Sequence, residues 1–147
     1  MSLVSKAPIN LQYVQRATGI LAQTGTRPLF AITGRVVLTH LLGEITTVIQ
    51  AQADATKLIN TPNVGSAVDL CATNDITGDV VNGFYTITGT AANAMVNSTT
   101  SPAFKIASPV TLQPGTLDMN CAASNTGSVK WTLMYYPLDN GAAVYAI

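Results

Sequence analysis

Apolar and polar residues alternate along most of the chain from residue 28 onward, with Gly, Pro and Asn between the alternating segments. The clearest run places its large apolar side chains at every second position, namely Val129, Trp131, Leu133 and Tyr135. Successive side chains of an extended strand point to opposite faces, so this spacing predicts a strand with one buried face. We expect this strand to lie at the centre of a sheet protein.

Further strands follow from the same pattern. They are expected at residues 30–41, 45–52, 56–61, 67–73, 84–90, 103–106, 110–112 and 117–122. A tight turn at residues 42–44 is expected to join the first two. The pair Asn140-Gly141 stands between two strand-like segments, which predicts a terminal β-hairpin of residues 129–135 and 142–147. So many short strands with frequent turn residues favour an all-β protein whose residues 28–147 form a β-sandwich or jelly-roll-like domain.

Two segments fit this pattern less well. Residues 45–59 contain several alanines and would form a helix on propensity alone, but the β-branched run at residues 46–49 favours a strand. Residues 1–27 show no sustained period, so we interpret them as an extended N-terminal arm. A short helix around residues 11–17 of this arm is left open.

The composition favours a subunit of an assembly over a free, monomeric domain. At 147 residues the chain is long enough for one domain with its own core. Charged residues make up only 10% and hydrophobic residues 48%, whereas an ordinary soluble domain has about 25% charged residues. A surface of Thr, Asn, Ser and Ala is desolvated at low cost, which favours an oligomer or a subunit of a larger assembly.

The zero net charge hides an uneven distribution. Lys6, Arg16 and Arg27 give residues 1–27 a charge of +3 with no acid, while four bases and seven acids give residues 28–147 a charge of −3. A basic arm on an acidic body is a possible docking device, although three solvated bases would explain the charges equally well. We expect neither nucleic acid nor a membrane as a partner, because no basic domain and no apolar run of about 18 residues is present.

Candidate catalytic chemistry is sparse, so we expect no enzyme, metal site or cofactor. His40 is the single histidine and lies in an apolar strand, where packing is a more common role than catalysis. Cys71 and Cys121 are expected to be free, buried thiols rather than a disulfide or a zinc site. Asp75 and Asp79 flank a turn, and capping of that turn is favoured over calcium binding because the oxygen series of a calcium loop is missing.

Two segments resemble a known family. They read ITGRVVLTHLLGEITT at residues 32–47 and NTGSVKWTLMYYPLDNGA at residues 125–142. In their general pattern of residues they are similar to the small decoration, or cement, proteins of tailed-bacteriophage heads. The similarity extends over most of residues 30–147 but includes no diagnostic motif.

The resemblance implies a structural virion protein that is made in the host cytoplasm and binds the outside of an expanded capsid. Its partners would be copies of itself, as a dimer or trimer, and the major capsid protein. The arm is the expected contact, through its bases Lys6, Arg16 and Arg27 and its apolar residues Leu3, Ile9, Leu11 and Ile20. Strand addition to a sheet edge is one possible mode of contact.

Three other functions stay open at this point. A tail or head-fibre subunit would share the low charge and the β structure, but it should polymerise into rings or filaments. A carbohydrate-binding sandwich should present a cluster of exposed aromatic residues, and aromatic residues are only 6% of this chain. An enzyme is disfavoured by the missing acid-base constellation.

Overall fold

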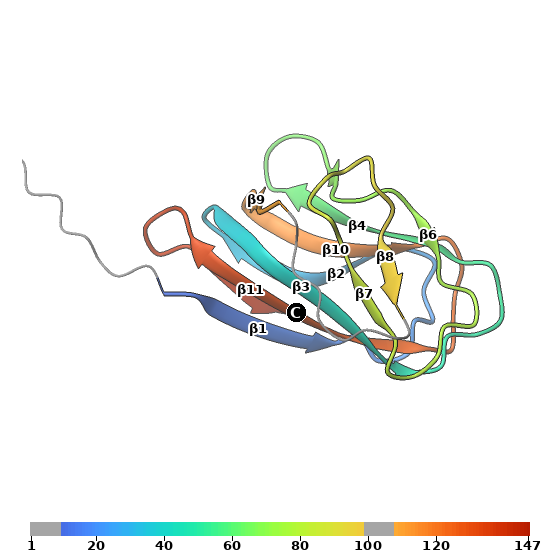
Figure 1. Ribbon diagram of the computed structural model, residues 1–147. Helices are drawn as coiled ribbons and strands as arrows, with labels where there is room; N and C mark the ends of the chain where they lie inside the picture. Colours follow the sequence, from blue (N-terminus) through green and yellow to red (C-terminus); the bar gives the residue numbers. More distant parts are fainter. Residues whose placement is uncertain (1–9, 99–107) are drawn as a thin grey trace, which may run out of the picture.

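Most of the segments in which apolar and polar residues alternate form strands in the structure. The computed structural model describes residues 10–98 and 108–147, and within these ranges it contains strands and no helix (Figure 1). The strands are β1 Gln12–Ala17, β2 Gly25–Thr33, β3 Val36–Thr47, β4 Ala55–Pro62, β5 Val68–Asp69, β6 Asn74–Asp75, β7 Phe84–Thr86, β8 Val96–Ser98, β9 Val110–Leu112, β10 Gly115–Cys121, β11 Ser128–Pro137 and β12 Ala143–Ala146. The strand expected at residues 103–106 lies outside the described residues.

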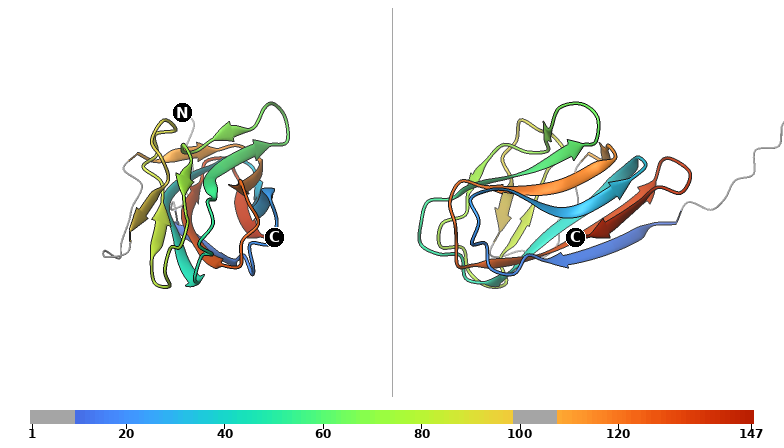
Figure 2. Two further views of the ribbon diagram at one scale, coloured as in Figure 1. Left: turned by 90° about the vertical axis from the view of Figure 1, so that its right-hand side faces the viewer. Right: turned by 180° about the vertical axis from the view of Figure 1, so that it is seen from behind.

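The strands form two antiparallel sheets that pack face to face (Figure 2). The first has the order β1-β11-β3-β7-β8, with β9 also paired to β3. The second has the order β12-β2-β10-β4-β5, with β6 also paired to β4. The expected all-β fold and its β-sandwich architecture are therefore confirmed.

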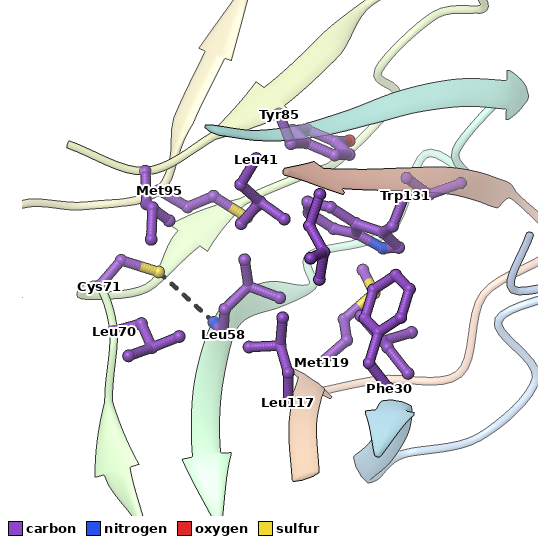
Figure 3. Packing of buried hydrophobic residues seen from close by; sticks show 14 of the residues in the cluster. Phe30, Leu41, Leu58, Leu70, Cys71, Tyr85, Met95, Leu117, Met119 and Trp131 are labelled. Carbon is purple, nitrogen blue, oxygen red and sulfur yellow. Dashed lines mark hydrogen bonds between the residues drawn. The ribbon is translucent and has the colours of Figure 1, made fainter. Parts of the chain in front are cut away.

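The core lies between the inward faces of the two sheets. On β11, Val129, Trp131 and Leu133 are fully buried, as their alternation predicts. Figure 3 shows Trp131, Tyr85 and Leu41 from the first sheet facing Phe30, Leu58 and Met119 from the second. Burial of a large apolar side chain stabilises the fold by roughly 1.5–3 kcal/mol, so this shared core is what holds the two sheets together.

The tight turn expected at residues 42–44 is wrong. Strand β3 continues through Gly43, and the chain turns instead at Gly34, whose φ of +67° lies in the left-handed region that favours glycine. Gly43 has a different role, because a Cβ there would lie 2.7 Å from Cζ3 of Trp131. The absent side chain makes room for the indole ring, so the glycine marks close packing and not a turn.

The terminal hairpin is also wrong, although the turn itself is present. Strand β12 pairs with β2 in the second sheet, because β1 and β3 already occupy both sides of β11. The connection is held by Asp139, whose carboxylate accepts hydrogen bonds from the backbone N–H of Arg35 at 2.8 Å and from its guanidinium at 2.7 Å. The chain therefore crosses from one sheet to the other at this turn.

The helix left open around residues 11–17 is wrong as well. Residues 12–17 form β1, which pairs with β11 from Gln12 opposite Tyr135 to Ala17 opposite Lys130 without a register shift. Leu21, which follows β1, is 1% exposed and belongs to the core. The described part of segment 1–27 is thus built into the sandwich, and only residues 1–9 lie outside the description.

Residues 45–59 form neither one helix nor one continuous strand. Strand β3 ends at Thr47, a connecting segment follows, and β4 begins at Ala55. Ile49 in this connection is fully buried, and its backbone N–H donates to the carbonyl of Asp79 at 2.9 Å. Ala51 and Ala53 therefore lie in a loop that the buried side chains of Ile49 and Asp54 hold in place, and Ala55 begins β4.

Candidate partner-binding surface

The residues expected to contact a partner gather on one side of the sandwich where they are described. Leu3, Lys6 and Ile9 lie outside the described residues. Leu11 and Ile20 flank β1, Arg16 lies within it, and Arg27 lies in the neighbouring part of β2. This is the side of the molecule where β1 and β12, the edge strands of the two sheets, run near each other (Figures 1 and 2).

Side chains of β1 alternate between the core and solvent. Val14 is half-buried and packs against the core cluster, whereas Tyr13 is 73% exposed. Gln15 is exposed and its Nε2 donates to Oγ1 of Thr132 on β11 at 3.0 Å. One face of β1 thus anchors the strand and the other presents an aromatic and an amide side chain.

Backbone groups of β1 also divide into two sets. Thr18 N–H, just beyond the strand, donates to the carbonyl of Val129 at 2.8 Å. Because an antiparallel ladder alternates, the N–H and C=O groups of the even-numbered positions point toward β11. Those of Tyr13, Gln15 and Ala17 point away from it. Among the described strands β1 pairs only with β11, so this row of groups forms a free edge, here called the β1 edge.

Two arginines lie close together beside this edge and are here called the arginine pair. Arg16 Nε donates to the main-chain oxygen of Ile147, and Arg27 Nη1 donates to the carbonyl of Ile20 at 2.9 Å. Partial burial lowers the pKa of Arg16, and the positive charge of Arg27 lowers it further. The backbone places the two residues close together, because Ile147, which accepts from Arg16, donates its N–H to the carbonyl of Leu29 at 3.1 Å, two residues beyond Arg27 on β2.

The arginine pair differs from every other described cation in its partners. The remaining three form salt bridges with side-chain carboxylates: Arg35 with Asp139 at 2.7 Å, Lys57 with Asp69 at 2.7 Å and Lys130 with Glu44 at 3.1 Å. Within residues 10–98 and 108–147, Arg16 and Arg27 have only main-chain oxygen acceptors. This side of the sandwich therefore carries positive charge that no side-chain carboxylate balances.

Large apolar side chains are exposed around the same edge. Leu11 is 55% exposed, Ile20 62% and Tyr145 on β12 56%. Single exposed apolar residues are common, but a group of them with Tyr13 at an open sheet edge is typical of an interaction site. The β1 edge, the arginine pair and these side chains together form the candidate partner-binding surface.

Sequence reasoning found the arginines and the flanking apolar residues but missed Tyr13 and Gln15. Their signal was present, since Tyr13 and Gln15 alternate with Val14 as in a half-buried strand. It was obscured because Leu11, Val14 and Ala17 also fit a short amphipathic helix. Pairing with β11, which no local pattern reveals, decides between the two.

The candidate catalytic residues, one histidine and two cysteines, have the burial and contacts of residues with a structural role. His40 is half-buried on β3, with Nδ1 3.1 Å from Oγ1 of the adjacent Thr39. Cys71 and Cys121 are free and buried, as expected. Burial raises the pKa of Cys71 and raises that of Cys121 to about 11, which keeps both thiols protonated near neutral pH.

Aspartates at the expected turn act as hydrogen-bond acceptors. Asp75 accepts from the backbone N–H of Thr77 at 3.1 Å and from that of Asp54 at 3.0 Å, and these bonds with the Thr77 hydroxyl lower its pKa. The predicted capping role of Asp75 is confirmed. Asp79 instead accepts from the hydroxyl of Tyr85 at 2.7 Å. In the part of the chain that the structure describes, no group of His, Cys, Asp or Glu side chains could hold a metal ion.

A groove of about 290 Å³ lies at the other side of the sandwich, near β5 and β9. Its described lining includes Val68, Leu70 and Val110 with Asn60 and Gln113, and contains no aromatic side chain. Sugar sites commonly stack the ring on an aromatic residue, so this groove gives little support to carbohydrate binding. No helix that could cross a membrane is found among the described residues.

Comparison with known proteins adds no relative to this description. No protein-family model, no curated protein and no solved structure matches the chain.

Proposed function

We propose that the chain is a non-enzymatic structural protein of a virion, a decoration protein that binds the outside of a tailed-phage head and stabilises it. The observation that carries the proposal is the candidate partner-binding surface. It combines an open sheet edge, exposed apolar side chains and the arginine pair on one side of a poorly charged sandwich.

The resemblance of residues 32–47 and 125–142 to head decoration proteins directs the proposal to a capsid. In the sandwich these two segments are neighbours, because β3 and β11 pair along most of their length. Together they form the centre of one sheet and carry the Trp131 packing site. The resemblance therefore concerns the strands at the centre of this sheet. The contact with the capsid is assigned to the neighbouring strand β1.

A decoration protein gains affinity by repetition. An icosahedral shell presents the same site many times, and a symmetric oligomer of this chain would engage several copies at once. Linking binding events in this way multiplies weak individual affinities by large factors. A modest surface such as this one, with two exposed tyrosines and two arginines, is sufficient for that purpose.

Co-sedimentation tests the proposal. Purified protein is mixed with emptied, expanded capsids of the phage that encodes it, and unexpanded procapsids serve as the control. Saturable binding at a fixed stoichiometry to expanded capsids supports the decoration role. Failure to bind, combined with growth of the protein alone into rings or tubes, would instead favour the tail or head-fibre subunit, for which the open β1 edge is also suited.

A further inference from the structure

The β1 edge lacks most of the features that normally protect a sheet edge. Such edges are usually protected by charged side chains, Pro, a bulge or a covering segment, and β1 has one of these, the charged Arg16. Strand β1 contains no Lys and no Pro, and its register with β11 has no bulge. The N–H and C=O groups of Tyr13, Gln15 and Ala17 are thus arranged as a regular template for one more strand. Among the described residues, the one side-chain hydrogen bond to this row is at the Ala17 carbonyl, which accepts from Arg16 Nη1 at 3.5 Å.

The side chains beside this template indicate the chemistry of the strand that it would bind. Arg16 lies on the same face of β1 as Val14, which packs against the core between the sheets, and Arg27 lies on β2 of the second sheet. Arginine prefers carboxylate acceptors, with which it forms charge-assisted hydrogen bonds. A carboxylate on the added strand would satisfy both guanidinium groups and remove the repulsion between them.

No side-chain carboxylate of the described residues forms a salt bridge with Arg16 or Arg27. All seven acidic residues of the chain lie in the described ranges. Three form salt bridges, and Asp54 and Asp118 are buried. Asp75 accepts hydrogen bonds from the N–H groups of Asp54 and Thr77, and Asp79 accepts from Tyr85 and Asn97. Residues 1–9 contain Lys6 and no acid. A second copy paired edge to edge would instead bring two arginine pairs together.

We propose that the β1 edge binds an extended, carboxylate-bearing segment of a different protein, which adds to the first sheet beyond β1. Backbone hydrogen bonds to Tyr13, Gln15 and Ala17 hold the segment. Arg16 and Arg27 select a carboxylate on it, and the exposed ring of Tyr13 covers its neighbouring apolar side chain. The inference rests on the proposed function, since it names the chemistry of the shell segment that the proposed decoration protein would bind.

Labelled peptides test the inference without capsids. The probe is a short peptide of alternating Thr and Glu, and peptides of alternating Thr and Gln or Thr and Lys are its controls. Binding to the full chain is followed by fluorescence anisotropy, and amide hydrogen exchange is followed by NMR. The Thr-Glu peptide should bind most tightly and should slow exchange at Tyr13, Gln15 and Ala17, whose amides point away from β11.

Two pairs of variants separate the backbone from the arginines. Gln15→Pro removes an outward N–H and should abolish binding, whereas Gln15→Ala loses the same side-chain bond to Thr132 and should bind normally. Arg27→Gln should weaken Thr-Glu binding roughly tenfold, as expected for loss of one charge-assisted hydrogen bond. Lys57→Gln removes a cation whose partner is Asp69 and should have no effect. Circular dichroism confirms that each variant is folded.

Three results would overturn the inference: equal binding of the Thr-Lys peptide, binding that survives Gln15→Pro, or no binding of any peptide. Self-association of the chain that Gln15→Pro abolishes would likewise overturn it and make a second copy the occupant. The outcome of the capsid experiment is independent of the outcome of the peptide experiment. Capsid binding unaffected by Gln15→Pro and Arg27→Gln would leave the decoration role standing without this contact, and peptide binding without capsid binding would do the reverse.

Discussion

Replacing Gly43 with alanine tests the packing at the centre of the sandwich. The new Cβ would lie 2.7–2.9 Å from three atoms of the Trp131 ring, well inside ordinary contact distance. Trp131 is fully buried and its ring centre is 6.3 Å from that of Tyr85, so it has little freedom to move away. In an open strand the same substitution would stabilise by about 0.5–1 kcal/mol, because glycine loses more entropy on folding. Overpacking costs typically 1–3 kcal/mol, so we expect a net loss of about 1–2 kcal/mol.

Urea unfolding followed by circular dichroism measures this loss as a lower midpoint with an unchanged slope. Trp131→Phe, alone and combined with Gly43→Ala, completes a double-mutant cycle. The smaller ring leaves room for the methyl group, so the double variant should be more stable than the sum of the single losses by about 1 kcal/mol. A Gly43→Ala protein as stable as the wild type, with no coupling to Trp131, would refute the pairing of these two residues in β3 and β11.

Other predictions concern the edge strand, the thiols and the loop before β12. Val14→Pro should destabilise the fold by about 2–4 kcal/mol in urea unfolding, because it removes an N–H that points toward β11 and a side chain packed on the core. Cys71 and Cys121 should react slowly with a thiol reagent in the native protein and rapidly in urea, since burial raises the pKa of both. The pKa of Asp139 is lowered by its hydrogen bonds with Arg35. The stabilising contribution of the Asp139 carboxylate is therefore present at neutral pH and is lost as the pH falls through the pKa of the folded state. Asp139→Asn should therefore lower the melting temperature near neutral pH, and its difference from the wild type should shrink as the pH falls into the acidic range and the wild-type carboxyl becomes protonated.

Local pattern was sufficient to predict the sheet class and the strongest strands. The alternation at residues 129–135 identified the buried face of β11, since period two is a property of each strand by itself. The two glycines at positions 34 and 43 were not distinguished. Both interrupt an apolar run, and the choice between a turn and a close contact depends on Trp131, which is far away along the chain.

Strand partners were the part that local pattern could not provide. Pro137 to Gly141 contains the residues of a turn, and a turn is present there. Which sheet β12 then joins depends on whether β11 still has a free side, and β1 occupies that side. The same pairing turned residues 12–17 from a possible helix into a strand.

The candidate surface was predictable in part of its residues but not in its shape. Charge counting identified Arg16 and Arg27, which lie on different strands and in different sheets. Their proximity follows from the way the two sheet edges meet. The open backbone of the β1 edge has no signal in composition at all, because it depends on which strands are missing beside it.

Truncation experiments have to respect this architecture. Removal of residues 1–27 would delete β1, the buried Leu21 and the start of β2, and so would unfold the sandwich. Deletion limited to residues 1–9 leaves every described strand in place. It is the appropriate variant for testing the contribution of Leu3, Lys6 and Ile9 to binding.

The most direct test of the proposed role is co-sedimentation with emptied, expanded capsids, comparing two double variants with the wild type. Arg16→Gln with Arg27→Gln removes the arginine pair, and Arg35→Gln with Lys130→Gln removes the same charge from salt-bridged positions elsewhere. We expect saturable binding of the wild type and the control, and binding by the first variant that is at least tenfold weaker. No binding of the wild type to expanded capsids would contradict the decoration role, and equal loss in both variants would contradict the placement of the contact at β1.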